Sequence, residues 1–161
     1  MNQYVLILII FFLASCSNNQ DNMQRQENIE IAQAWMDNLF IHSDLNAAKS
    51  LMHEDFTFVY MGNTGPGGIE HGKDGFINDY LPIVGELLPT GIVLTTIDVI
   101  ADKDGVALIQ IGDSQGINGE YDNKYVFTFK MKNSLIYAVR EYNSDILVAT
   151  RLYKNKLIPL N

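Results

Sequence analysis

The residues with the clearest capacity for chemistry lie on two segments that alternate in polarity near the end of the chain. The alternation places Val139, Glu141 and Asn143 on one face of a strand, and it places Tyr125 and Phe127 together on one face of the strand before it. A carboxyl group buried among aromatic rings has its charged form disfavoured, so its pKa rises, and this suits a general acid or base. Glu141 is therefore the candidate proton-transfer residue.

Other polar groups are expected near Glu141, and they leave two interpretations open. Tyr60, Tyr125 and His71 are candidate hydrogen-bond donors to a developing enolate, with Glu141 as the general base. Alternatively, Glu141 accepts hydrogen bonds from Tyr60, Tyr125 or His71 and only organises the core. Asp113 is expected either at the mouth of the cavity or in a turn.

Apolar and aromatic residues at strand and helix spacing form a predicted ligand pocket around these groups. A filled core would use the same residues, so a pocket and a packed core both remain open. The predicted pocket comprises Trp35, Met36, Phe40, Phe58, Tyr60, Phe76, Tyr80, Ile111, Asp113, Tyr125, Phe127, Val139, Glu141 and Asn143.

The sequence predicts neither a metal site nor a cofactor. His42, His53 and His71 are scattered, and no two of them have the i, i+4 spacing of ligands on a helix. Cys16 is the only cysteine, so the domain has no disulfide. The chain has no other thiol for nucleophilic catalysis, and the acylation of Cys16 predicted from the motif described next would exclude a cysteine hydrolase.

The first residues form a predicted targeting segment. Residues 4–14 are an apolar run that is too short to span a bilayer as a helix. The motif L-A-S-C at residues 13–16 resembles a bacterial lipobox, whose cysteine becomes the lipidated first residue. A cleaved secretory signal with an incidental cysteine is the alternative. The resemblance implies a signal peptide over residues 1–15 and, with Ser17 after the cysteine, an outer-membrane anchor facing the periplasm.

Charge and composition divide the remainder of the chain. Residues 16–26 are polar and without apolar periodicity, which predicts a flexible tether. Residues 27–161 are enough for one domain with a real core. The net charge of −8 and the absence of a basic stripe argue against a nucleic-acid partner. The same charge argues against electrostatic adhesion to anionic lipid, which leaves acyl chains as the anchor.

Periodicity and turn residues give the expected elements. Helices are expected over residues 27–41, 45–52 and 73–88, and Pro82 should kink or split the third one. Strands are expected over residues 55–61, 91–101, 106–112, 120–131 and 135–142, with a tight turn between the last two. This order predicts an α+β fold, with a mainly antiparallel sheet and helices packed on one face.

Several stretches resemble the SnoaL-like branch of the nuclear transport factor 2 superfamily, which includes the ketosteroid isomerases. They are D-L-x-x-A-x-x-L-M-x-x-D-F at 44–56, H-G-K-x-x-F at 71–76, Y-V-F-T-F at 125–129 and R-E-Y at 140–142. The resemblance covers about residues 29–149. It implies a cone-shaped, strongly curved sheet wrapped round a long first helix, two shorter helices, an open apolar cavity and a homodimer formed through the sheet.

The catalytic positions of the isomerases carry other residues here. In those enzymes a helix tyrosine and a neutral aspartic acid form an oxyanion hole, and a strand aspartate moves the proton. The resemblance places Met36, Tyr125 and Tyr60 at these three positions. Met36 cannot donate a hydrogen bond and the proton-shuttling base is missing, so an isomerase of that mechanism is not expected. The family's R-E-Y-x-D ending is also altered, because Asp145 stands one place late.

Three functions from different classes follow. The favoured one is a membrane-tethered envelope lipoprotein whose domain binds a small apolar or aromatic molecule in the cone. The second is a cofactor-free cyclase, isomerase or dehydratase-like enzyme that uses Glu141 as general acid or base. The third is a homodimeric assembly module that pairs through the open sheet face.

Overall fold

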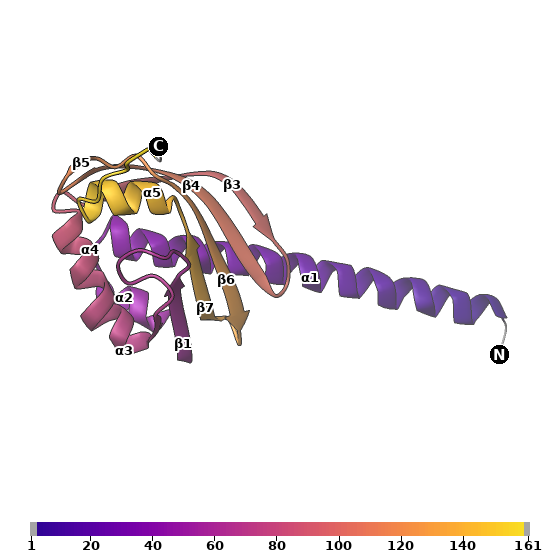
Figure 1. Ribbon diagram of the computed structural model, residues 1–161. Helices are drawn as coiled ribbons and strands as arrows, with labels where there is room; N and C mark the ends of the chain where they lie inside the picture. The colour runs from indigo at the N-terminus through magenta and orange to yellow at the C-terminus, as the bar shows by residue number, and fades with distance from the viewer. Residues whose placement is uncertain (1–2, 160–161) are drawn as a thin grey trace.

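The computed structural model describes the backbone of residues 3–159 and the side chains of residues 19–159 (Figure 1). Helices and strands both contribute, which confirms the α+β class. In chain order the elements are α1 (Gln3–Phe40), α2 (Leu45–Ser50), β1 (Met52–Tyr60), β2 (Glu70–Gly72), α3 (Lys73–Gly75), the π-helical turn η1 (Phe76–Tyr80), α4 (Leu81–Leu87), β3 (Ile92–Ala101), β4 (Gly105–Gly116), β5 (Gly119–Glu120), β6 (Lys124–Lys132), β7 (Leu135–Tyr142), α5 (Asp145–Leu147) and the π-helical turn η2 (Val148–Leu152).

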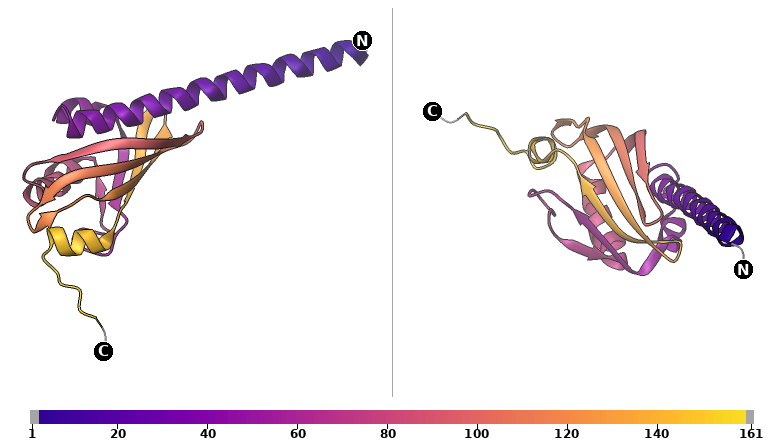
Figure 2. Two further views of the ribbon diagram at one scale, coloured as in Figure 1. Left: turned by 90° about the horizontal axis from the view of Figure 1, so that it is seen from above. Right: turned by 90° about the vertical axis from the view of Figure 1, so that its right-hand side faces the viewer.

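The strands form one curved sheet that does not close on itself. Its strand order is β2-β1-β7-β6-β4-β3, with β5 paired to β4. Among the described strands, β1 and β7 are the only parallel neighbours, so the prediction of a mainly antiparallel sheet is confirmed. The second half of α1 lies along the sheet, and α3 and α4 cover the end of the cone beside β1 (Figure 2).

The β6–β7 hairpin has the predicted turn and the predicted inner face. Asn133 and Ser134 both have φ of 54°, which is the backbone of a type I′ turn whose twist matches the flanking strands. Across the hairpin, Phe129 pairs with Val139 and Phe127 pairs with Glu141. Because side chains alternate along a strand, these four residues point to the same face and are buried there.

The core is built largely from aromatic rings that four sequence regions contribute. Trp35 of α1 stacks on Phe76 of η1 with ring centroids 5.4 Å apart, and it meets Phe129 of β6 edge-on at 5.8 Å. Phe58 of β1 contacts both Phe76 and Tyr80, at 4.7 and 4.5 Å. Offset and edge-on arrangements of this kind are the favourable ones for aromatic pairs. They fix α1 and η1 against the sheet.

The first helix is much longer than expected. The predicted tether, residues 16–26, is helical and continuous with the predicted helix, and α1 ends at Phe40. This stretch has no glycine or proline, and amide pairs such as Gln24 with Asn28 lie at i, i+4 spacing, 3.1 Å apart. Arg25 Nε also donates to the Ala101 carbonyl at 3.0 Å, so contacts with the domain begin before residue 27. The Cys16 side chain lies outside the described residues.

The third predicted helix is one unbroken helical run from Lys73 to Leu87, and a π-helical turn stands just before Pro82 in place of a split. The chain passes from α3 through η1 into α4, and Pro82 occupies the first turn of α4. Pro82 has no backbone N–H to donate, and the helix accommodates it just after the π-helical turn η1. Three other features were not expected from the sequence. They are the short strand β2, the extension of β4 to Gly116, and the α5–η2 segment after β7.

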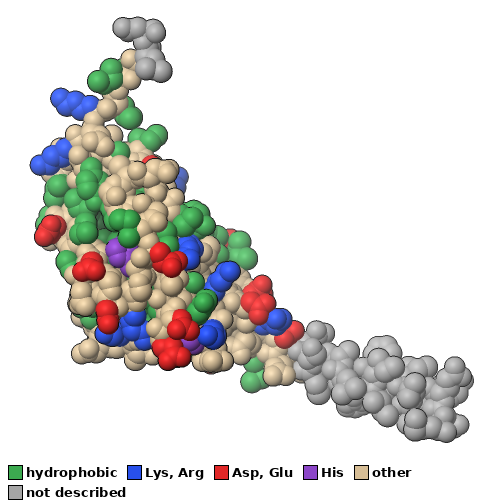
Figure 3. All heavy atoms as spheres, turned by 60° about the horizontal axis from the view of Figure 1, so that its bottom comes forward, with side chains coloured by type: hydrophobic (Ala, Val, Ile, Leu, Met, Phe, Trp, Pro, Cys, Tyr) green, Lys and Arg blue, Asp and Glu red, His purple; other side chains and the backbone are tan. Residues whose placement is uncertain are grey.

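On the face of the domain that Figure 3 shows, charged side chains of both signs are interspersed with apolar side chains. In the part of the chain that the structure describes, no helix is both long enough and apolar enough to cross a membrane.

Candidate functional site

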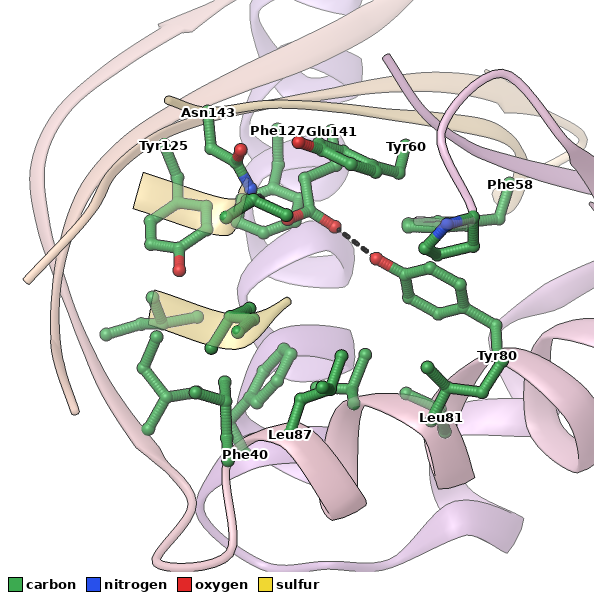
Figure 4. A pocket seen from close by; sticks show the side chains of 18 of the residues that line it. Phe40, Phe58, Tyr60, Tyr80, Leu81, Leu87, Tyr125, Phe127, Glu141 and Asn143 are labelled. Atoms are coloured by element: carbon green, nitrogen blue, oxygen red, sulfur yellow. Dashed lines mark hydrogen bonds between the residues drawn. The ribbon is translucent and has the colours of Figure 1, made fainter. Parts of the chain in front are cut away.

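A cavity of about 70 Å³ lies inside the cone, between the sheet, the end of α1, α4 and η2 (Figure 4). It is lined chiefly by aromatic and aliphatic side chains, with a few polar groups that converge on it. The lining residues are Trp35, Phe40, Phe58, Tyr60, Pro66, Phe76, Tyr80, Leu81, Ile83, Val84, Leu87, Leu88, Ile92, Leu94, Tyr121, Tyr125, Phe127, Glu141, Asn143, Val148, Leu152 and Tyr153.

Glu141 is the acidic group of this cavity. Its carboxylate accepts a hydrogen bond from Tyr80 Oη at 3.0 Å and another from Asn143 Nδ2 at 2.8 Å. Burial disfavours the charged form and raises the pKa of Glu141 to about 7, although both hydrogen bonds act to lower it. The carboxyl group therefore changes protonation near neutral pH, where a side chain can both accept and return a proton.

The two hydrogen-bond donors to Glu141 come from different parts of the fold, Asn143 from the end of the sheet and Tyr80 from the helical side. Asn143 follows β7 on the same face, two residues on, as strand alternation predicts. Tyr80 ends the π-helical turn η1, and it reaches Glu141 from the opposite side of the cavity (Figure 4). Its pKa is raised by burial and then by the neighbouring carboxylate. Asn143 Oδ1 is buried and has no hydrogen-bond partner among the described residues.

The expected hydrogen bonds from Tyr60, Tyr125 or His71 to Glu141 are replaced by others. Tyr60 lines the cavity, but its hydroxyl donates to Asp145 Oδ1 at 2.6 Å. Tyr125 stacks on Phe127 with centroids 5.5 Å apart, and burial together with the neighbouring Tyr121 raises its pKa. The sequence could not separate these outcomes, because a hydroxyl on a strand face can turn to any acceptor within reach.

Asp145 organises the rim of the cavity. Its carboxylate accepts the Tyr60 hydroxyl, the Asn63 backbone N–H at 3.0 Å and the Thr64 hydroxyl at 3.1 Å. These bonds, that of Tyr60 foremost, lower the pKa of Asp145. A side chain at Gly62 would overlap the Tyr60 ring and this carboxylate, which explains the glycine. Asp145, which stands one place late in the R-E-Y-x-D pattern, therefore ties the loop of residues 62–68 to α5.

His71 stands beside the cavity and does not line it. It lies on β2 opposite Phe58, and its ring centroid is 5.5 Å from that of Tyr80. Its Nε2 atom is buried without a hydrogen-bond partner among the described residues. His71 therefore contacts Tyr80, the hydrogen-bond donor to Glu141, and does not contact Glu141 itself.

Four other predicted pocket residues lie elsewhere. Val139 and Met36 are buried in the core without lining the cavity. Ile111 and Asp113 are exposed on the outer face of β4, because this strand continues to Gly116 and its inward residues are the even-numbered ones. Both expectations for Asp113, the cavity mouth and a turn, were wrong. The remaining ten predicted residues line the cavity.

Two walls of the cavity lie outside the predicted pocket residues. The apolar side of α4, with Leu81, Ile83 and Leu88, closes the cavity opposite the sheet. From the tail, Val148, Leu152 and Tyr153 also line it. The apolar period of residues 81–88 was the available signal for α4, whereas nothing in the tail shows on which side of the sheet it folds back.

One cluster has the composition of a metal site. Ligand atoms of His53, Glu54 and Asp55 lie within 4.8 Å of one another. His53 Nδ1, however, accepts the Asp55 backbone N–H at 3.0 Å, and Asp55 pairs with Lys132 at 3.4 Å. With these two groups engaged, the cluster is no preformed set of ligands.

Comparison with solved structures identifies the architecture. TerC, co-crystallised with polyporic acid, superposes with a TM-score of 0.69 at 22% identity, over 79% of this chain and 98% of its own. An NTF2-like protein from Burkholderia xenovorans LB400 gives 0.66 at 16% identity, over 80% and 97%. A protein with a cystatin-like fold from Xanthomonas campestris gives 0.67 at 18%, over 80% and 98%. No protein-family model and no curated protein matches the chain. The chain therefore has the nuclear transport factor 2-like, cystatin-like fold that its motifs predicted.

Proposed function

We propose that this protein binds a small apolar or aromatic molecule in the cavity of the cone. The observation that carries this is the lining itself, in which rings and aliphatic side chains surround a few converging polar atoms of Glu141, Tyr80 and Asn143. Small-molecule sites have this composition, since apolar walls supply affinity and a few polar groups fix orientation. That TerC, which has the same fold, was co-crystallised with polyporic acid also supports this proposal.

The size of the cavity limits how the ligand enters. At about 70 Å³ it has room for a handful of water-sized groups, and small-molecule sites commonly have roughly 300–1,000 Å³. The wall formed by Leu152 and Tyr153 belongs to a short segment after β7, and α4 opposite it presents flexible aliphatic side chains. A ligand larger than a single ring displaces one of these two walls as it binds.

The test uses Trp35, which lines the cavity and is the only tryptophan. The probe is 4-nitrobenzyl alcohol, a neutral aromatic molecule whose nitro group quenches indole fluorescence. We expect saturable quenching of the wild-type protein and about tenfold weaker binding by Val84→Phe, which fills the cavity from α4. Glu86→Gln, an exposed change on the same helix, serves as the control and should bind like the wild type. Quenching that rises linearly without saturation, or that is equal in Val84→Phe, contradicts the proposal.

A second candidate, a proton-transfer enzyme, is favoured by the pKa of Glu141 of about 7. A buried carboxyl group with this pKa can act as general base and then as general acid. We expect its carboxyl carbon to titrate near pH 7 in an NMR experiment. The Tyr80→Phe variant should titrate at higher pH, because it loses a hydrogen bond to the charged form. Tyr142→Phe, on the outer face, should leave the midpoint in place, and a wild-type midpoint near 4.5 removes this candidate.

We also propose that the domain is held at the bacterial outer membrane, facing the periplasm, by lipid on Cys16. The support is the apolar run and the L-A-S-C motif at residues 13–16. Metabolic labelling with an alkynyl fatty acid tests this: label should enter the wild type and should be absent from Cys16→Ser.

A further inference from the structure

A second cavity lies between α1 and the inner face of β3 and β4, at the edge of the sheet. We call it the α1–β3 groove; its apolar walls include Met36 of α1 and Leu108 of β4. Its volume of about 380 Å³ falls in the usual range for small-molecule sites. Phe40, Ile92 and Leu94 line both this groove and the central cavity, so they form a partition between the two.

A pair of polar side chains on neighbouring strands stands in the α1–β3 groove. Gln110 is 4% exposed, and its Nε2 donates to Thr96 Oγ1 at 2.9 Å. Its Oε1 has no hydrogen-bond partner among the described residues. If the amide were turned by half a turn, its oxygen would accept the Thr96 hydroxyl and its Nε2 would be left over instead. In either orientation, Thr96 satisfies only one end of the Gln110 amide.

The free end of this amide favours a ligand that carries a hydroxyl group. A buried amide group without a partner is unfavourable, so a ligand that supplies the missing hydrogen bond gains affinity. A hydroxyl donates to Oε1 or accepts from Nε2, and it therefore complements either orientation of Gln110. The last torsion of glutamine has a broad minimum, which allows the free atom to turn toward the ligand.

The charge of the α1–β3 groove disfavours an ionised ligand. Among the described residues that line it, Asp37 is the only charged one, and it forms no ion pair with another described residue. A carboxylate on the ligand would meet this like charge in a chain of net charge −8. An ammonium group would lose its water at Gln110 and meet only a neutral amide there. The polar end of the ligand is therefore expected to be neutral.

We propose that the α1–β3 groove binds a neutral alcohol or phenol whose apolar body has one or two rings. The groove has room for roughly a dozen water-sized groups of about 30 Å³, which fits a body of that size. The body lies against Met36, Ile41 and Leu108, and the hydroxyl bonds to the free end of Gln110. Ile41 is 68% exposed, so the ligand also covers apolar surface that otherwise faces water. This site is separate from the one proposed inside the cone, and neither proposal depends on the other.

The test titrates the full chain with three probes that share an indane body, and backbone amide NMR locates the binding. 5-Indanol carries the hydroxyl, indane makes no hydrogen bond, and indane-5-carboxylate carries a negative charge. We expect saturable shifts at Asp37, Thr96 and Gln110 with 5-indanol. Indane should bind several-fold more weakly because it leaves the amide unpaired, and the carboxylate should not saturate these residues.

Two changes assign the binding to this groove. Gln110→Met removes the amide at similar volume, and this variant should bind 5-indanol no better than it binds indane. Gln33→Phe narrows the groove from an exposed position on α1 and should weaken 5-indanol binding about tenfold. Ala34→Phe is the matched control, because it adds the same ring at the next position, which is exposed and does not line the groove. It should bind 5-indanol like the wild type.

Three results would overturn the proposal. The first is that indane or the carboxylate binds in the groove as well as 5-indanol does. The second is that Gln33→Phe binds 5-indanol unchanged. The third is that the shifts occur only at Val84 and Glu141, which would place the probe in the central cavity.

Discussion

When the pH is raised from 4 to 8.5, the wild type is expected to lose about 3 kcal/mol of unfolding free energy that the Glu141→Gln variant keeps. The folded-state pKa of about 7 lies above the ordinary value of 4.5. The native protein therefore binds the proton more tightly than the unfolded chain does. The contribution of this group is fully present below about pH 4.5 and is lost as the pH rises through 7. A difference of roughly 2.5 pKa units corresponds to about 3 kcal/mol.

Urea denaturation of both proteins at several pH values measures this effect. Other titrating groups cancel in the difference between wild type and variant, which isolates Glu141. The matched control is Glu86→Gln, whose side chain is exposed on α4, and its difference from the wild type should stay nearly constant with pH. If the difference in unfolding free energy between Glu141→Gln and the wild type does not change with pH, then water reaches this carboxylate in the folded protein. Glu141 would then not be a buried acid–base group.

Replacing Trp35 by alanine is expected to cost about 3–5 kcal/mol of unfolding free energy, in the range measured for buried aromatic residues. Trp35 is 1% exposed and packs against Phe56, Phe76 and Phe129, with centroids 5.4 to 6.2 Å away. Removing it leaves a hole where α1, η1 and the sheet meet. For a domain stabilised by roughly 5–15 kcal/mol in total, this is a large loss.

Trp35→Phe separates packing from hydrogen bonding at the same position. The indole Nε1 has no hydrogen-bond partner among the described residues, so the phenylalanine loses ring volume but no bond. We expect a cost of about 1 kcal/mol by thermal or urea denaturation. Equal costs for alanine and phenylalanine would mean that the N–H, not the ring, stabilises this position. Because Trp35 lines the cavity, the alanine variant should also accept a bulkier quencher, detected by calorimetry.

Much of the sheet was predictable because β4 and β6 alternate between buried and less buried residues along their length. The hairpin that joins Phe127 to Glu141 followed from the period and from its turn residues. The short strand β2 was not predictable, because its three residues have no period of their own and their pairing with β1 supplies the order. The helical form of residues 16–26 was missed because polar composition indicates solvent exposure and does not exclude a helix.

The candidate site was predictable on the sheet and less so elsewhere. Alternation placed Glu141 and Asn143 together, and both line the cavity. The hydrogen bond from Tyr80 was not predictable, because a π-helical turn shifts the phase of the helix that carries this residue. Asp113 points outward because β4 continues past it to Gly116. This continuation was not predictable, because no turn residue in the sequence marks the end of β4.

Because α1 is one continuous helix, the part of it that precedes the domain is a rigid arm and not a flexible linker. A helix advances about 1.5 Å per residue and keeps its direction, whereas a flexible chain of the same length samples all directions. Arg25 and Asn28 bind the turn between β3 and β4, at the point where the arm meets the domain (Figure 1). A surface that holds the start of the arm therefore also sets the direction in which the cone faces. With the lipid anchor proposed above, the domain is expected to stand at a defined height and angle above the membrane.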